Sequence, residues 1–192
     1  MSLCLYAVRC NFTGEPAREA AWHAWYDGPK TAQMLELPLF LTMQRFAAAS
    51  LDTRRKYLAL WLVRSPDAFT TPEYRAQWGF AEWTPLIADW SRDLYAAPDR
   101  IDALVDIGPR DALHLVAFDG MSVDKARASL TRARDSLPGA TWLEAVGLDR
   151  HSPFLGLRKV ARGARISPLD KDIGASETIF DPITPRRRAR VR

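Results

Sequence analysis

The sequence predicts an α+β protein built from two halves, each with the element order β-α-β-β-α-β, the second of them degenerate. Three observations predict this fold class. Short apolar and aromatic runs alternate with segments whose small or apolar residues recur at helical spacing. Proline and glycine mark the ends of most segments. The same order of elements then begins again after a connecting stretch at 99–109.

The first half opens with an apolar and aromatic run that predicts a strand over 3–12. Pro16 stands near the first position of a predicted helix, where proline is favoured. Gly28-Pro29 is expected to interrupt this helix, with a further turn through Leu35. Strands are then predicted at 39–48, 56–64 and about 92–96, and a second helix begins with Thr71 as its cap.

The second half repeats this order with fewer clear elements. A strand is predicted at 112–118, a helix at 122–137, and two strands at 141–148 and 154–160. After Gly163 the pattern fades into short polar segments. The order β-α-β-β-α-β is that of a ferredoxin-like unit. We therefore predict a first ferredoxin-like half at 1–98, a degenerate second half at 99–185, and a tail at 186–192.

The positive charge of the chain is concentrated in this tail. Five arginines lie in the last seven residues, and subtracting them from the formal net charge of +4 leaves a net charge of −1. A nucleic-acid-binding domain usually carries its positive charge on a folded face. We therefore expect no nucleic-acid partner, and we expect the basic tail to be solvated and disordered.

Hydropathy and cysteine placement give the expected compartment. No apolar run approaches the roughly 20 residues of a membrane helix, and Met1–Tyr6 shows no secretory signal pattern. Cys4 and Cys10 lie in one extended segment, too far apart to bridge each other. We expect a cytoplasmic protein with reduced thiols and no membrane partner.

Four runs of the first half resemble the EthD-like branch of the dimeric α/β-barrel superfamily: His23-Ala24-Trp25-Tyr26-Asp27-Gly28-Pro29-Lys30, Leu35-Glu36-Leu37-Pro38-Leu39-Phe40, Gln44-Arg45-Phe46 and Lys56-Tyr57-Leu58-Ala59-Leu60. Two positions differ from the family pattern, because Lys30 stands where histidine is common and Leu39 where glycine is common. The resemblance implies a barrel of two four-stranded sheets packed face to face. That barrel would close within one chain or by homodimerisation.

The resemblance also implies a class of activity. Family members include isomerases, lyases, cyclases, cofactor-free oxygenases and some haem enzymes, so fold does not fix the reaction. We expect a small cofactor-free enzyme (an isomerase, cyclase, lyase or monooxygenase) that acts on an aromatic, polyketide-like or lactone metabolite in a barrel cavity. The alternative is a non-catalytic ligand-binding or accessory protein of a catabolic pathway. Haem is a weaker alternative as cofactor, with His114 or His151 as its axial ligand.

The helix that carries the first run holds the candidate catalytic residues. His23 and Asp27 lie four residues apart, the spacing of a base and its orienting carboxylate, although an ordinary surface pair has the same spacing. Tyr26 and Lys30 are also four apart, and a phenol beside an ammonium can stabilise an enolate, although solvated lysines are common. We predict that His23, Tyr26 and Asp27 transfer protons and that Lys30 binds substrate.

Strand parity supplies the remaining candidates. Tyr57 and Trp61 share one face of their strand, and leucines occupy the other. The leucine face suits packing on a helix, so we expect Tyr57 and Trp61 to face the barrel cavity, with Trp25 also lining it. An inward Arg9 or Arg45 would bind a substrate carboxylate or carbonyl, whereas an arginine near a strand end can reach solvent. No phosphate loop, nucleophile elbow or paired metal ligands are present, so we expect no metal site.

Overall fold

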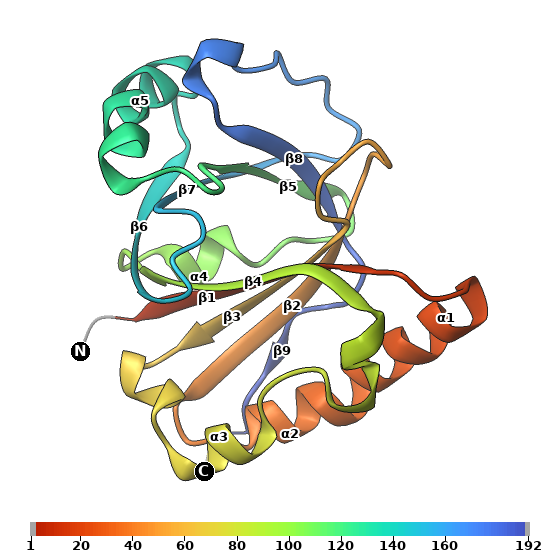
Figure 1. The fold of residues 1–192 in the computed structure, drawn as a ribbon. Helices are drawn as coiled ribbons and strands as arrows, with labels where there is room; N and C mark the ends of the chain where they lie inside the picture. The colour runs from red at the N-terminus through yellow and green to blue at the C-terminus, as the bar shows by residue number, and fades with distance from the viewer. Residues whose placement is uncertain (1–2, 191–192) are drawn as a thin grey trace.

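The computed structural model describes residues 3–190, and at its centre is a closed barrel of antiparallel strands (Figure 1). Neighbouring strands follow the order β3-β1-β4-β6-β7-β5-β8-β2, and β2 also pairs with β3, which closes the barrel within one chain. Their bounds are β1 Cys4–Phe12, β2 Phe40–Ala48, β3 Tyr57–Val63, β4 Ile87–Ala96, β5 Asp111–Ala117, β6 Thr141–Leu148, β7 Phe154–Ala161 and β8 Ser176–Pro182. The predicted α+β class and barrel are therefore confirmed.

The two halves contribute four strands each with the same internal arrangement. In the first half β1 and β3 are the central strands, flanked by β4 and β2, and in the second β5 and β7 are central, flanked by β8 and β6. The halves join where β4 pairs with β6 and β2 pairs with β8. Because every strand has a neighbour on both sides, the barrel exposes no free sheet edge.

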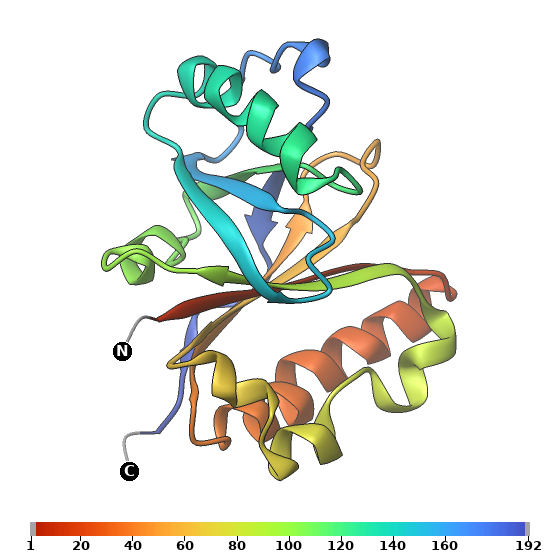
Figure 2. The same ribbon diagram turned by 60° about the vertical axis from the view of Figure 1, so that its left-hand side comes forward.

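Helices cover the outer faces of the two sheets (Figure 2). In the first half, α1 (Pro16–Trp25), a π-helical segment η1 (Tyr26–Lys30) and α2 (Thr31–Leu35) form one continuous helical stretch. The expected interruption at Gly28-Pro29 is thus a change from α-helical to π-helical hydrogen bonding, and the following turn runs through Leu35 as expected. The wider π turn accommodates a proline that lacks a backbone N–H, and such turns are frequent at functional sites.

The remaining helical segments are shorter, apart from α5. The Thr71 hydroxyl accepts the Tyr74 N–H and begins α3 (Pro72–Gln77), as predicted. Connecting segments are η2 (Pro66–Phe69), η3 (Ala81–Leu86) and α4 (Ile101–Leu104). In the second half α5 (Val123–Ser136) covers the sheet, and only the turn η4 (Lys171–Ile173) stands before β8. The second half therefore has fewer helical segments than the first.

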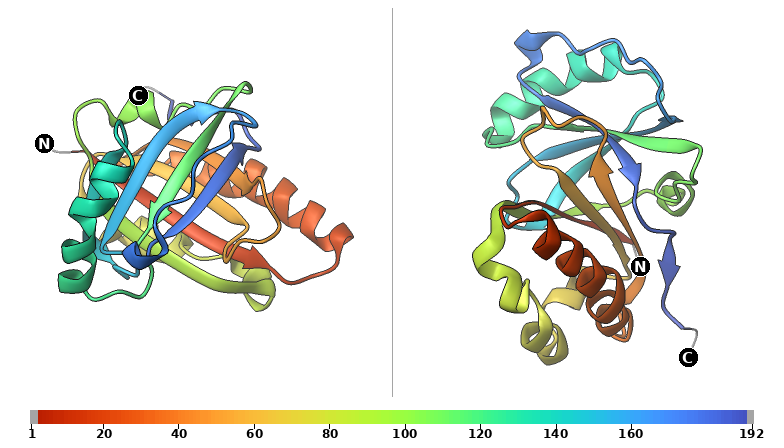
Figure 3. Two further views of the ribbon diagram at one scale, coloured as in Figure 1. Left: turned by 90° about the horizontal axis from the view of Figure 1, so that it is seen from above. Right: turned by 90° about the vertical axis from the view of Figure 1, so that its right-hand side faces the viewer.

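The predicted disordered tail is wrong for the described residues up to 190. Arg187–Arg188 form β9, which pairs with Thr42 and Met43 of β2, on the edge that β8 also uses. Arg186 and Arg188 pair with Asp102. β9 thus continues the line of β8 down the side of the barrel (Figure 3). Residues 191–192 lie outside the described part.

The side chains divide into a barrel interior and two outer layers. The interior is mostly aliphatic and contains Leu58, Leu60 and Leu62 of β3. Trp61 of the same strand lies in the outer layer with α1 and α2, and Tyr57 packs against that layer. The predicted orientation of β3 was therefore reversed. Aliphatic side chains and the rings of Phe46, Tyr95 and Phe180 fill the narrow interior, whereas most aromatic side chains of the first half pack between the sheet and the helices.

Within residues 3–190, no helix is both long enough and apolar enough to cross a membrane.

Candidate functional site

The first sheet and its helices enclose a cleft, here called the aromatic cleft. The lining comes from β1, η1, α2, β3, the end of α3 with the loop that follows it, and β4: Tyr6, Val8, Tyr26, Lys30, Met34, Trp61, Tyr74, Trp78, Gly79, Phe80, Trp90 and Arg92. Its enclosed part has a volume of about 30 Å³, and all empty space in and above it amounts to about 380 Å³. The enclosed part has room for roughly one water molecule. A larger ligand would have to move side chains at the rim.

Lys30 is a buried cation in this cleft. Its side chain is only 7% exposed, and its Nζ donates a hydrogen bond to the backbone oxygen of Gln77. Within residues 3–190 it forms no ion pair with a carboxylate. Burial lowers the pKa of Lys30 to about 8. A substantial fraction of Lys30 is therefore neutral at mildly alkaline pH and able to accept a proton.

Three phenols line the cleft with Lys30. Tyr6, Tyr26 and Tyr74 are all buried. Burial raises the pKa of Tyr6 and of Tyr26, so both phenols stay protonated and can donate. The Tyr74 hydroxyl meets no partner in hydrogen-bond geometry within the described residues. An unpaired buried hydroxyl is costly, and a ligand oxygen would relieve that cost.

Two tryptophans and an arginine form the rim. Trp78 and Trp90 are 47% and 41% exposed, and their ring centroids lie 6.3 Å apart. The Arg92 guanidinium lies over Trp78, 4.5 Å from the ring centroid, and Arg92 Nε lies 3.3 Å from Asp149 Oδ1. Gly79 follows Trp78 with a φ of +90°, which favours glycine.

Behind the cleft, Arg45 joins several of the predicted catalytic residues. Its guanidinium carbon lies 4.2 Å from the Tyr26 ring centroid and 4.7 Å from that of Trp22. Arg45 Nη1 donates to Asp27 Oδ1 at 2.6 Å, and Nη2 donates to His23 Nδ1 at 3.1 Å. Because arginine cannot accept, His23 uses Nδ1 as acceptor and carries its proton on Nε2. Burial and the Arg45 charge lower the pKa of His23, so the ring is neutral.

The predicted His23–Asp27 pair is thus bridged by Arg45, which binds both partners. Tyr57 stacks edge-on against His23, with ring centroids 4.9 Å apart, and its hydroxyl donates to Glu19 Oε1 at 2.6 Å. Trp25 packs beside Lys30, whose Nζ lies 6.0 Å from its ring centroid.

Of the predicted site residues, Tyr26, Lys30 and Trp61 line the aromatic cleft itself. The others on this side of the sheet support it from outside the lining: His23, Trp25, Asp27, Arg45 and Tyr57. Only Arg9 lies elsewhere.

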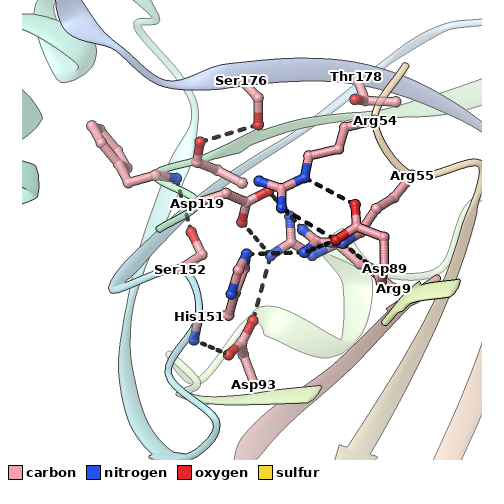
Figure 4. A network of polar contacts seen from close by, with 12 residues as sticks. Arg9, Arg54, Arg55, Asp89, Asp93, Asp119, His151, Ser152, Ser176 and Thr178 are labelled. Atoms are coloured by element: carbon pink, nitrogen blue, oxygen red, sulfur yellow. Dashed lines mark hydrogen bonds and ion pairs between the residues drawn. The ribbon is translucent and has the colours of Figure 1, made fainter. Parts of the chain in front are cut away.

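Arg9 points to the inside of the barrel, at one mouth (Figure 4). Its Nη1 and Nη2 donate to Asp119 at 3.0 and 2.6 Å, and Nη2 also lies 3.4 Å from Asp93. Arg55 donates to the same Asp119 at 2.8 Å and to His151 Nε2 at 2.9 Å. An inward arginine was one predicted outcome. Here, however, protein carboxylates compensate its charge, and the network joins the two halves of the barrel.

Sequence reasoning missed Tyr74, Trp78 and Arg92. It treated 78–95 as an aromatic-rich stretch with a short strand near its end. β4 in fact begins at Ile87. With that start, strand parity places Trp90 and Arg92 on the face of Leu94, which packs in the outer layer with Trp61.

The residues considered for haem do not fit an axial role. His114 Nε2 lies 3.1 Å from Glu177 Oε1, and its Nδ1 accepts from Arg158 Nη2 at 3.3 Å. The Nε2 of His151 is bound by Arg55. Neither histidine therefore offers a free Nε2. Residues 3–190 also contain no group of three or more potential metal ligands placed to hold an ion.

Comparisons with known proteins support the fold. No protein-family model and no curated protein matches the sequence. An anthrone oxidase-like protein matches with a TM-score of 0.61 at 10% identity, over 99% of this chain and 94% of that chain. A candidate chlorite dismutase matches with a TM-score of 0.51 at 10% identity, over 96% of each chain.

A candidate monooxygenase from Lactobacillus acidophilus NCFM matches with a TM-score of 0.50 at 7% identity, over 96% of this chain and 95% of that chain. At such low identities the likeness shows the fold alone. That fold is the dimeric α/β barrel, in agreement with the superfamily that the first-half motifs resemble.

Proposed function

We propose that this chain, which has the dimeric α/β-barrel fold, is a small enzyme that acts without a bound cofactor. It removes a proton from an aromatic, polyketide-like or lactone metabolite in the aromatic cleft, and the resulting anion is isomerised, cyclised, cleaved or oxygenated. The anthrone oxidase-like and candidate monooxygenase neighbours favour oxygenation among these outcomes. Fold likeness alone does not select a reaction, so the site must carry the argument.

One observation carries this proposal. Lys30 is buried among phenols and indoles, has no carboxylate partner within residues 3–190, and has a pKa lowered to about 8. A neutral amine in such a setting is a base matched to weakly acidic C–H or O–H groups. The hydroxyls of Tyr26 and Tyr74 can donate to the oxyanion that forms.

The geometry favours different roles for the three residues predicted to transfer protons, His23, Tyr26 and Asp27. Tyr26 keeps its proposed role as a group that contacts substrate. His23 and Asp27 fix the guanidinium of Arg45, and Arg45 packs on the ring of Tyr26. We therefore assign His23, Asp27 and Arg45 as positioning residues.

An anthrone would be oxidised to its quinone by deprotonation, addition of molecular oxygen and loss of water. Neutral Lys30 takes a proton from the C–H next to the aromatic rings, which leaves an enolate. Molecular oxygen accepts the electrons of that enolate and forms a carbon–oxygen bond, and a proton completes the hydroperoxide. Loss of water then gives the quinone, so one oxygen atom enters the product and the other leaves in water.

An oxygen-uptake assay with dithranol, an anthrone that is easily obtained, tests this proposal. We expect turnover whose rate rises as the pH passes about 8, since neutral Lys30 is the base. Lys30→Met should lower the rate by about a hundredfold, typical for loss of a general base. The exposed Lys125→Met on α5 is the matched control and should leave the rate unchanged. Equal rates for Lys30→Met and wild type would exclude Lys30 as the base.

A second candidate function is binding of a small ligand without turnover. Side chains fill most of the cleft and leave about 30 Å³, and a filled cavity favours a binding or accessory role over turnover. Saturable binding of dithranol without oxygen uptake or any change in product analysis would support this alternative.

We also infer finer relationships. The shared strand arrangement supports ferredoxin-like ancestry for both halves, and the first-half motifs support membership of the EthD-like branch. A homodimer and a cytoplasmic location stay expectations from the sequence. Light scattering of the purified protein measures its oligomeric state directly.

A further inference from the structure

The charged side chains that line the aromatic cleft are all positive. Its lining includes two cations, Lys30 and Arg92, and no aspartate or glutamate. Removing a cation from water costs free energy unless an opposite charge compensates it, and a ligand that carries a negative charge would supply that compensation.

Neither cation is neutralised inside the cleft. Among residues 3–190, Lys30 Nζ has the backbone oxygen of Gln77 as its sole hydrogen-bond acceptor. Arg92 has one carboxylate neighbour, Asp149, at 3.3 Å, and the Asp149 side chain is 37% exposed and lies outside the lining. Solvent screens such an exposed partner, so it compensates little of the arginine charge.

The polar side chains of the cleft also offer more hydrogen-bond donors than acceptors. Lysine and arginine can only donate, and buried phenols that keep their protons donate readily. The hydroxyl of Tyr74 is buried beside Tyr6 and Arg92, and no atom of the described residues meets it in strict hydrogen-bond geometry. Lys30, Tyr74 and Arg92 therefore present donors that together lack an acceptor with negative charge.

We propose that the aromatic cleft prefers aromatic substrates that carry a carboxylate, and that Arg92 selects them at the rim. This inference rests on the proposed function, since it names the substrate class of the same site. The guanidinium plane already lies over Trp78, so the aromatic body of a ligand can stack at the rim while its carboxylate meets Arg92. A planar guanidinium binds a carboxylate through two parallel hydrogen bonds, which an amide of the same shape cannot reproduce.

Calorimetric titration of the full chain with 2-naphthoate and with 2-naphthamide tests this proposal. The two probes share one ring system and differ in charge. We expect wild type to bind the carboxylate at least about tenfold more tightly than the amide, the gain of one charge-assisted contact. Arg92→Gln should remove that preference and leave amide binding nearly unchanged. The exposed Arg127→Gln on α5 serves as control and should keep the preference.

Asp149→Asn provides a test of opposite sign. It removes the carboxylate that competes for Arg92 and keeps an oxygen that can accept the Arg92 backbone N–H. We expect it to tighten naphthoate binding about threefold and to leave naphthamide binding unchanged, as for an exposed ion pair.

The remaining outcomes overturn one proposal or both. Equal binding of the two probes by wild type would refute selection by charge and leave the proposed function standing. Equal weakening of both probes by Arg92→Gln would show that Arg92 only supports the rim tryptophans. If neither probe binds to folded wild-type protein, the cleft is not a site for aromatic ligands, and both proposals fail.

Discussion

The guanidinium carbon of Arg45 lies 4.2 Å from the centroid of the Tyr26 ring, so a strand arginine supports a phenol of the cleft. Arg45 belongs to β2, and its guanidinium binds Asp27 of η1 and His23 of α1. The sheet and its covering helix are thus coupled at the point where Tyr26 enters the cleft.

Replacement of Arg45 should be strongly destabilising. Arg45→Met removes the partner of Asp27 and the support of two rings, and we expect the free energy of unfolding to fall by about 3 kcal/mol. Urea denaturation followed by circular dichroism measures this. Arg127→Met, which breaks an exposed ion pair with Glu144, should cost less than about 1 kcal/mol. A similar small loss for both variants would contradict a structural role for Arg45.

The buried amine of Lys30 should make stability depend on pH. The pKa of Lys30 is lowered in the folded state, so the burial penalty is present in full below pH 8, where both states are protonated. As pH rises from about 8 towards the unfolded value of 10.5, the folded state releases its proton first and the penalty is relieved. Between pH 7 and 10, wild type should gain about 2 kcal/mol relative to Lys30→Met. Urea unfolding at both pH values measures it, and a pH-independent difference would contradict it.

Gly156 should be intolerant of a side chain. A Cβ at this position of β7 would lie 2.7 Å from Cζ3 of the Trp142 ring on the neighbouring strand. Gly156→Ala should therefore cost about 1–3 kcal/mol, since the ring must shift. Gly147→Ala on β6 is the matched control, because its Cβ would make ordinary contact with Leu94 at 3.5 Å. Thermal unfolding of both variants gives the comparison, and equal melting temperatures would show that the Trp142 ring moves freely.

Asp119 should be required for joining the two halves at the barrel mouth. Its carboxylate compensates Arg9 and Arg55, which are both buried and both belong to the first half. Asp119→Asn keeps the shape and removes the charge, and we expect a loss of about 2–4 kcal/mol of stability in urea unfolding. Asp181→Asn, in a more exposed pair with Arg162, should cost less than about 1 kcal/mol. A near-neutral Asp119→Asn would mean that solvent reaches the network.

The predicted elements were mostly right because local patterns specify them. The strands predicted at 3–12, 39–48, 56–64, 112–118, 141–148 and 154–160 all occur, with bounds that differ by at most a few residues. β8 was missed because Ser176–Pro182 is a short and mostly polar run that ends in a proline. β9 was missed because its two arginines form a strand only by pairing with β2.

The sequence by itself determined the α+β class and the concentration of reactive side chains in residues 22–30, and the barrel was implied by the resemblance of its motifs to a known family. Apolar periodicity and turn residues act over short distances, so they can be read without coordinates. The tertiary structure alone decided which face of β3 meets the helices, and that Arg45 stands between His23 and Asp27. It also brought Tyr74 and Arg92 to Lys30 from distant segments. These relationships depend on how a closed barrel distributes volume and charge among all its strands, which no single segment encodes.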